Sequence, residues 1–138
     1  MENQYPLLFA LPQGGSSRKD MAKLGYDFGA KDFMVVAADH RGYPDEPYPQ
    51  DIQDVFCALA WVFENADKYA IDPEQIFLVG YSSGGTQAAQ VATFTEPSRY
   101  LEDCPYIWPD RVAFAGVVTV TGIFDYPYTL ETSPLIAE

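Results

Sequence analysis

The chain has 138 residues, a length that suits one domain, and 48% hydrophobic with 15% aromatic residues can form a packed core. Eight basic and twenty acidic residues give a net charge of −12, which repels phosphate backbones and anionic lipid surfaces. We therefore expect no nucleic-acid partner and no membrane partner, and no run approaches the roughly 20 apolar residues of a membrane span. Glu2, where a signal peptide would carry Lys or Arg, favours a cytoplasmic location.

The two cysteines, Cys57 and Cys104, lack the spacing of metal ligands. Their pattern predicts two separate small hydrophobic side chains, with a disulfide as the alternative. Neither a metal nor a cofactor is expected.

The first part of the chain predicts two buried strands joined by a helix. Tyr5–Leu11 is a continuous apolar run ended by a proline and two glycines, as expected for a strand buried on both faces. Two serines can then cap a helix over about residues 18–30. Asp32–Asp39 predicts the second strand, and the segment "HRGYPDEPYPQ" that follows it predicts a loop because it holds three prolines.

The second part predicts two helices and two more strands. From Asp51 the apolar residues recur every three or four positions, which predicts a helix that "AIDPEQ" ends. Ile76–Val79 predicts the third strand, 83 to about 94 a helix, and Ala113–Gly122 the fourth strand. The apolar positions of the helix from Asp51 are Ile52, Val55, Phe56, Leu59, Val62, Phe63 and Ala66.

Strands that alternate with helices indicate an α/β fold with a parallel sheet of four strands, flanking helices and right-handed crossovers. Functional sites of such sheets gather at the carboxyl ends of the strands. The four loops that carry polar or glycine-rich sequence, residues 12–17, 39–49, 80–85 and 121–128, each follow a predicted strand. We therefore expect all four at one edge of a single domain.

One of these loops contains a candidate nucleophile. Gly80-Tyr81-Ser82-Ser83-Gly84 matches G-x-S-x-G, the nucleophile elbow, in which a sharp strand-to-helix turn exposes a serine hydroxyl. A predicted strand precedes it and a predicted helix follows it, so the context supports the motif. The alternative is an incidental turn that carries no chemistry.

The order of these motifs resembles the α/β-hydrolase fold. Within that fold the chain is similar to the esterase and lipase group related to hormone-sensitive lipase and to bacterial feruloyl and acetyl esterases. The resemblance is carried by D-x-R-x-x-P after the second strand, the helix ending in W-x-x-x-N, the I-D-P turn and the elbow. It implies the spatial strand order 2-1-3-4, and a serine carboxylesterase that cleaves small ester substrates through an acyl-enzyme on Ser82.

The resemblance also implies an oxyanion hole, which in this group is usually an H-G-G-G turn after an earlier strand. Pro12-Gln13-Gly14-Gly15 occupies the matching place, so backbone N–H groups of Gly14, Gly15 and Ser83 are the expected donors. The sequence departs from the group at Pro12 and Gln13, so the hole is offset by one residue or uses the Gln13 amide. A plain glycine turn into a helix is the alternative.

A catalytic base is the missing component. The only histidine, His40, precedes Ser82 and falls in a structural slot that the resemblance places two strands away, about 10 Å from the serine's strand. We expect it to pack in its loop beside Asp39 and Arg41, which we expect to pair with each other. Asp125 follows the fourth strand and is the candidate triad acid, with capping of the next turn as its alternative.

These features predict the middle of a longer hydrolase, because members of the group begin with additional strands and continue into loops that bear the triad acid and histidine. Two other functions remain: a non-catalytic binding protein on the same fold, and a fragment of a prolyl-oligopeptidase-type serine peptidase. The outer strands would lack partners, which predicts self-association through apolar edges.

Overall fold

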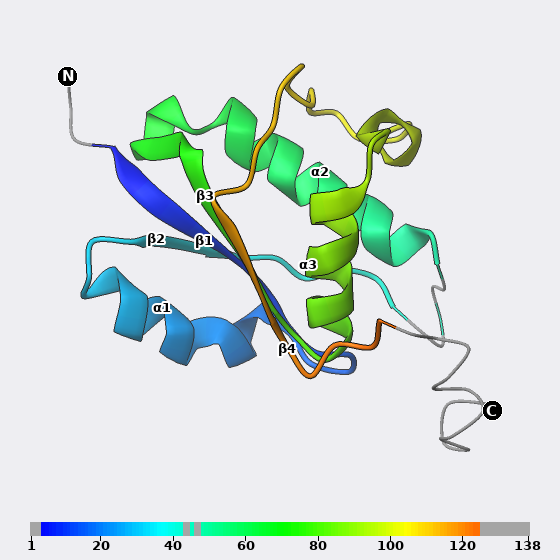
Figure 1. Cartoon of the computed structure of the whole chain (residues 1–138), viewed down its shortest axis with the longest axis horizontal. Coiled ribbons are helices and arrows are strands. Elements are labelled where there is room, and N and C mark those ends of the chain that lie inside the picture. Colours follow the sequence, from blue (N-terminus) through cyan, green and yellow to red (C-terminus); the bar gives the residue numbers. More distant parts are fainter. Residues whose placement is uncertain (1–3, 43–44, 46–47, 125–138) are drawn as a thin grey trace.

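A computed structural model describes residues 4–42, 45 and 48–124. It contains one parallel sheet in the order β2-β1-β3-β4 (Figure 1). The sheet confirms the predicted α/β class and the spatial order 2-1-3-4. The strands are β1 (Tyr5–Leu11), β2 (Met34–Ala37), β3 (Ile71–Tyr81) and β4 (Gly116–Val120).

Helices cover both faces of the sheet. Helix α1 lies on one face, while α2 and α3 lie together on the other (Figure 1). The predicted helix over 18–30 is a short 3-10 turn that continues into α1, and the other two helices begin within one residue of their predicted starts. The helices are η1 (Arg18–Met21), α1 (Ala22–Gly29), α2 (Gln50–Glu64), η2 (Asp67–Tyr69), α3 (Ser83–Thr93) and η3 (Pro97–Tyr100).

Strand β3 begins five residues before its predicted start. Ile71 pairs with Tyr5 at the beginning of β1, and the register shifts before Leu7 pairs with Ile76. The Tyr5 N–H also donates to the Ala70 carbonyl at 2.7 Å. These backbone bonds draw a Pro-containing segment into the sheet, although its side chains carry no strand pattern.

The core lies between the sheet and the α2/α3 layer. The apolar stripe predicted for α2 is buried there, against alternate residues of β1 and β3. The fully or nearly fully buried members of this core are Leu7, Phe9, Leu11, Ile52, Val55, Phe56, Leu59, Val62, Ala66, Ile71, Ile76, Leu78, Ala88 and Val91.

Across the described ranges, no helix is long and apolar enough to cross a bilayer.

Aromatic stacking joins the irregular connection after α3 to α2. The rings of Phe56 and Tyr100 stack at 5.3 Å, and Phe94 stacks on both at 5.9 and 5.1 Å. Trp108 meets Phe56 edge-on at 5.3 Å. Such pairs stabilise beyond the area they bury, so they hold this connection against the helix.

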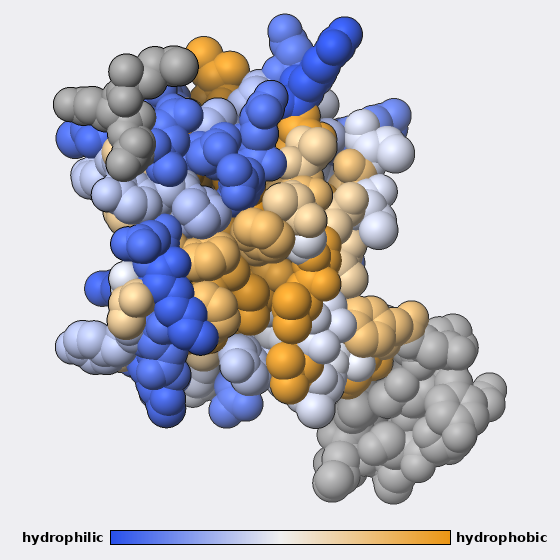
Figure 2. Space-filling model, turned by 60° about the vertical axis from the view of Figure 1, so that its left-hand side comes forward, coloured by the Kyte–Doolittle hydropathy of each residue, from blue (hydrophilic) through white to orange (hydrophobic). Residues whose placement is uncertain are grey.

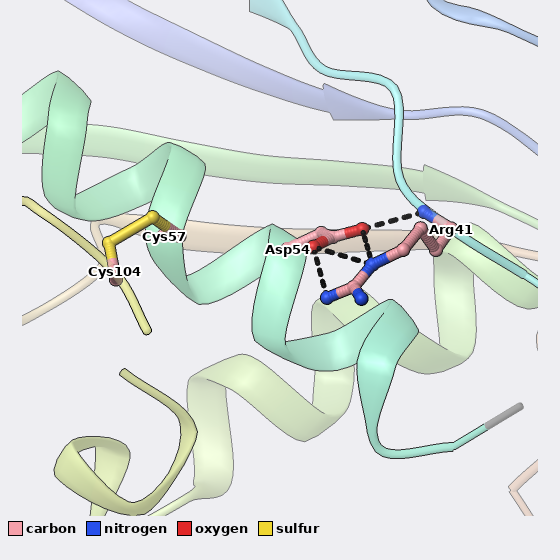
Figure 3. Close-up of a disulfide and its surroundings, with 4 residues drawn as sticks. All are labelled: Arg41, Asp54, Cys57 and Cys104. Carbon is pink, nitrogen blue, oxygen red and sulfur yellow. Dashed lines mark hydrogen bonds and ion pairs between the residues drawn. A yellow bond between two sulfur atoms is a disulfide. The ribbon is translucent and has the colours of Figure 1, made fainter. Parts of the chain in front are cut away.

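The prediction of two separate cysteine side chains was wrong. Cys57 on α2 and Cys104 in the connection form a disulfide across a sequence separation of 47 residues (Figure 3). The aromatic stack brings these segments together, and neither the stack nor the pairing could be recognised from cysteine spacing.

Removing the disulfide should destabilise the domain. For a loop of this length, the chain-entropy estimate gives about 4 kcal/mol. We expect a Cys57→Ala/Cys104→Ala variant to unfold at lower urea concentration than the oxidised chain. Reductant should lower the wild-type midpoint to that of the double variant and leave the variant unchanged; equal midpoints for the variant and the oxidised chain would contradict the assignment.

Strand β4 is an outer strand of the described sheet and is exposed along its length. Val117, Val118 and Val120 are 40%, 51% and 37% exposed. Figure 2 shows hydrophobic side chains gathered on one face of the molecule. Self-association through such an edge stays a prediction, since unpaired strands with apolar side chains can pair with another chain.

A charge on the outer strand tests that prediction. We expect Val118→Lys to shift the chain toward monomer in light scattering, because lysine on an edge strand opposes edge-to-edge pairing. Val118→Ile keeps the β-branched apolar surface and serves as the matched control, with association unchanged or increased. A wild-type chain that is monomeric at high concentration would overturn the prediction.

Candidate active site

Ser82 lies at the turn between β3 and α3, the placement that the motif predicts. Its backbone angles are φ 51° and ψ −120°, in the region that non-glycine residues seldom adopt. Such strain persists only where the surrounding structure holds it, and it is concentrated at functional sites. The turn therefore has the geometry of a nucleophile elbow, while the catalytic role of Ser82 stays a prediction.

The two outer glycines of the motif are required by backbone contacts. A Cβ at Gly80 would lie 2.6 Å from the Gly85 nitrogen, and closer still to the Gly84 carbonyl. A Cβ at Gly84 would lie 2.5 Å from the Pro12 oxygen, and closer still to that of Leu11. The start of α3 thus touches the main chain at the end of β1, and no side chain fits between them.

Three backbone hydrogen bonds hold Ser82 in place. Its N–H donates to the Val120 carbonyl at 2.7 Å. Its own carbonyl accepts from the N–H groups of Gly85 at 2.9 Å and Thr86 at 3.1 Å. Strand β4 and the first turn of α3 therefore fix the strained conformation, and the serine side chain remains only partly buried.

The candidate oxyanion turn lies against the elbow. A Cβ at Gly14 would lie 3.3 Å from the Ser83 Oγ, and Gly15 has φ +74°. Within the described part of the chain, the N–H groups of Gly14, Gly15 and Ser83 have no acceptor. These donors are free for a ligand, as an oxyanion hole requires, and their role stays a prediction.

The alternative of a plain turn also has structural support. The Ser16 N–H and Oγ both donate to the Gln13 carbonyl, at 3.2 and 3.0 Å. Ser17 accepts from the Lys19 N–H and caps the 3-10 turn that follows. The segment is thus a closed turn in its own right, and Gly14 within it lies beside Ser83.

His40 does not approach the elbow. It follows β2, and β1 lies between β2 and the strand that carries Ser82, so about 10 Å of sheet separates them. One imidazole nitrogen, Nδ1, lies 2.7 Å from the Arg41 carbonyl and is assigned as a donor to it. His40 is held in its own loop, as predicted.

The expected pairing of Asp39 with Arg41 was wrong. Asp39 accepts from the backbone and the side chain of Arg18, and Arg41 binds Asp54 on α2 (Figure 3). The Arg41 N–H, Nε and Nη2 donate to the Asp54 carboxylate at 2.7 to 3.2 Å. Asp39 and Arg41 therefore each join the loop after β2 to a helix. For Arg41, two guanidinium nitrogens contact one carboxylate, and such a bidentate contact favours a partner that a helix holds in place.

The candidate triad acid, Asp125, lies outside the described residues. The chain is fixed just before it, because the Thr86 hydroxyl donates to the Ile123 carbonyl at 3.0 Å and accepts from the Ile123 N–H at 2.9 Å. Among the residues that the structure describes, no three His, Cys, Asp or Glu side chains gather as metal ligands would.

Sequence reasoning missed a polar pair beside the elbow. Gln87 on α3 is only 4% exposed, and its Nε2 donates to Asp51 Oδ2 on α2 at 3.1 Å. The one signal was a glutamine four residues after Ser83, on the same face of the predicted helix. Nearby, the hydrogen bond between the Tyr48 and Tyr100 hydroxyls, slight burial and the Asp51 carboxylate raise the pKa of Tyr48 above its usual value.

Comparisons with known proteins agree with this geometry. Residues 12–133 match the model of the BD-FAE family. The chain belongs to the BD-FAE family. In sequence it is 39% identical over 79 residues to carboxylesterase NlhH of Mycobacterium tuberculosis, and 30% identical over 127 residues to the probable carboxylic ester hydrolase LipM of that organism. In structure it matches esterase B of Lactobacillus rhamnosis, with a TM-score of 0.80 at 21% identity, which shows the shared α/β-hydrolase fold.

The chain spans only part of these relatives. The matches cover 57% of this chain but 24% of NlhH, and 87% of this chain but 30% of LipM. For esterase B the shares are 97% and 44%. The family and the fold of this BD-FAE member are therefore shown, whereas its activity and substrates require a proposal.

The close packing at Gly84 gives a direct test of the elbow. We expect Gly84→Ala to lower the free energy of unfolding by about 3 kcal/mol, because the new methyl group meets main-chain atoms that cannot rotate away. Urea unfolding measures the change. Gly25→Ala in α1 is the matched control: its Cβ meets nothing within 4 Å, so it should be neutral or stabilising. Equal effects at the two positions would refute the packing argument.

Proposed function

We propose that this chain carries the nucleophile and oxyanion parts of a serine carboxylesterase that acts on small ester substrates. The observation that carries the proposal is the positive φ of Ser82 at a strand-to-helix turn bounded by two sterically required glycines. The relatives NlhH, a carboxylesterase, and LipM, a probable carboxylic ester hydrolase, support an ester as the substrate.

The proposed chemistry is acyl transfer. The Ser82 Oγ forms a bond to the ester carbonyl carbon while its proton passes to a base, and the carbonyl oxygen becomes negatively charged. In this proposal the N–H groups of Gly14, Gly15 and Ser83 stabilise that oxygen. The carbon–oxygen bond to the alcohol then breaks, the alcohol leaves with the proton, and water later releases the acid from Ser82.

No catalytic base has been identified for Ser82. His40 is the chain's only histidine and lies a strand too far away. A serine hydroxyl without an adjacent base stays protonated and is a poor nucleophile. We therefore propose that the 138-residue chain alone lacks a complete triad and hydrolyses esters barely above background, with a remnant of up to roughly 10³ to 10⁴ over water from substrate binding and the oxyanion donors.

The rate of p-nitrophenyl acetate hydrolysis tests this proposal. We expect the wild type, Ser82→Ala and His40→Ala to be similarly slow, because no proton acceptor makes Ser82 reactive. Rapid turnover that both substitutions abolish would show that His40 is the base after all. Turnover abolished by Ser82→Ala alone would show that another group completes the site.

A non-catalytic binding protein is the second candidate, favoured by the separation between His40 and Ser82. Binding of short esters with no hydrolysis above the rate in buffer would favour this candidate, whereas slow hydrolysis above that rate would favour the esterase.

The cytoplasmic location stays a prediction, and the disulfide weighs against it. Disulfides persist in oxidising compartments and are rare in the cytosol. Alkylation of the protein as taken from its host would settle the matter: two reactive thiols fit the cytosol, and none fits an oxidising compartment.

A further inference from the structure

A pocket of about 370 Å³ opens beside the elbow, between the amino-terminal ends of α2 and α3. Ser83, which follows the candidate nucleophile Ser82, lines this pocket, so a molecule bound in it would lie next to the elbow. Its lining residues are Tyr48, Asp51, Ser83, Thr86, Gln87 and Gln90.

The Asp51–Gln87 pair fixes the chemistry of this pocket. The Gln87 amide nitrogen donates to Asp51 Oδ2 at 3.1 Å. That contact sets the amide orientation, because the opposite orientation would place two acceptor oxygens together. The Gln87 Oε1 therefore accepts no hydrogen bond within this pair, and it belongs to a side chain that is only 4% exposed.

Two buried oxygens of this pair, Asp51 Oδ1 and Gln87 Oε1, have no donor among the described residues. A buried acceptor without a donor costs roughly 1 to 3 kcal/mol, and more when it is charged. The Asp51–Gln87 contact supplies one donor, to Oδ2 alone. The site is thus built with acceptors in excess, and it suits a ligand that brings donors.

The negative charge of Asp51 favours a positively charged ligand. Asp51 is the only charged side chain among the six lining residues, and the chain as a whole carries −12. A hydroxyl group would supply one donor and leave the carboxylate uncompensated. A primary ammonium group supplies three N–H donors and a positive charge.

We infer that this pocket binds a primary ammonium group. As a substrate subsite it would select esters that carry such a group, and that part rests on the proposed function. The binding of ammonium itself does not depend on esterase activity.

Titration of the full chain with methylammonium, followed in proton–nitrogen correlation spectra at constant ionic strength, tests the site. We expect saturable shifts at the amides of Ser83, Thr86 and Gln87. Methanol provides a donor without charge, and tetramethylammonium provides charge without donors, so both should bind at least about tenfold more weakly. Absence of saturable shifts, or equal binding of the three probes, would overturn the inference.

Two variants locate the binding. Asp51→Asn keeps the side-chain shape but removes the charge, and should weaken methylammonium at least about tenfold. Gln87→Leu removes the second acceptor and should also weaken it. Asp67→Asn, an exposed carboxylate in the first turn of η2, is the matched control and should have no effect. Retained binding in Asp51→Asn and Gln87→Leu variants whose spectra show a folded chain would reject the pocket.

A last comparison separates the subsite from the proposed function. In the Ser82→Ala background, methylammonium should bind as in wild type, and β-alanine methyl ester should bind at least about tenfold more tightly than methyl butanoate. Equal binding of the two esters would reject the substrate role. Preferential binding of the ammonium ester, with wild-type hydrolysis no faster than in buffer alone, would leave the pocket standing and count against the proposed esterase.

Discussion

The close approach of α3 to the end of β1 is the constraint on which the site depends. Gly84 touches the carbonyls of Leu11 and Pro12, and Gly80 packs against the backbone at Gly84 and Gly85. Within these contacts the chain turns from β3 into α3, and Ser82 at that turn has a positive φ. They also place the turn after β1 against Ser83, so the serine and the candidate oxyanion donors are positioned by the same packing.

Sheet order explains why Ser82 and the candidate oxyanion donors come together whereas His40 does not join them. Strand β1 neighbours β3, so its carboxyl-terminal loop meets the elbow. Strand β2 is one position further out, and its loop directs Arg41 toward Asp54 on α2 instead (Figure 3). The parts that are assembled are main-chain N–H groups and one hydroxyl, fixed by local geometry.

The sequence was sufficient for the features that local patterns specify. Apolar runs and the spacing of α2 predicted the elements, and the glycines around Ser82 predicted the turn. The early start of β3 at Ile71 was missed, because backbone bonds to Tyr5 create it without an apolar pattern. The Cys57–Cys104 bond and the Asp51–Gln87 pair were missed for a related reason: both join residues more than 30 positions apart, and only tertiary packing brings them together.

The proposed ammonium pocket would also affect the chemistry proposed at the elbow, because Ser83 lines it. A carboxylate beside the reaction centre raises the energy of a developing oxyanion, since like charges repel more strongly where water is excluded. Asp51 would therefore oppose the step that Gly14, Gly15 and Ser83 are proposed to assist. An ammonium group bound between them would neutralise Asp51, satisfy the buried acceptors and remove that repulsion. The same ligand would thus relieve a cost to folding and a cost to chemistry, whereas a neutral ester would relieve neither.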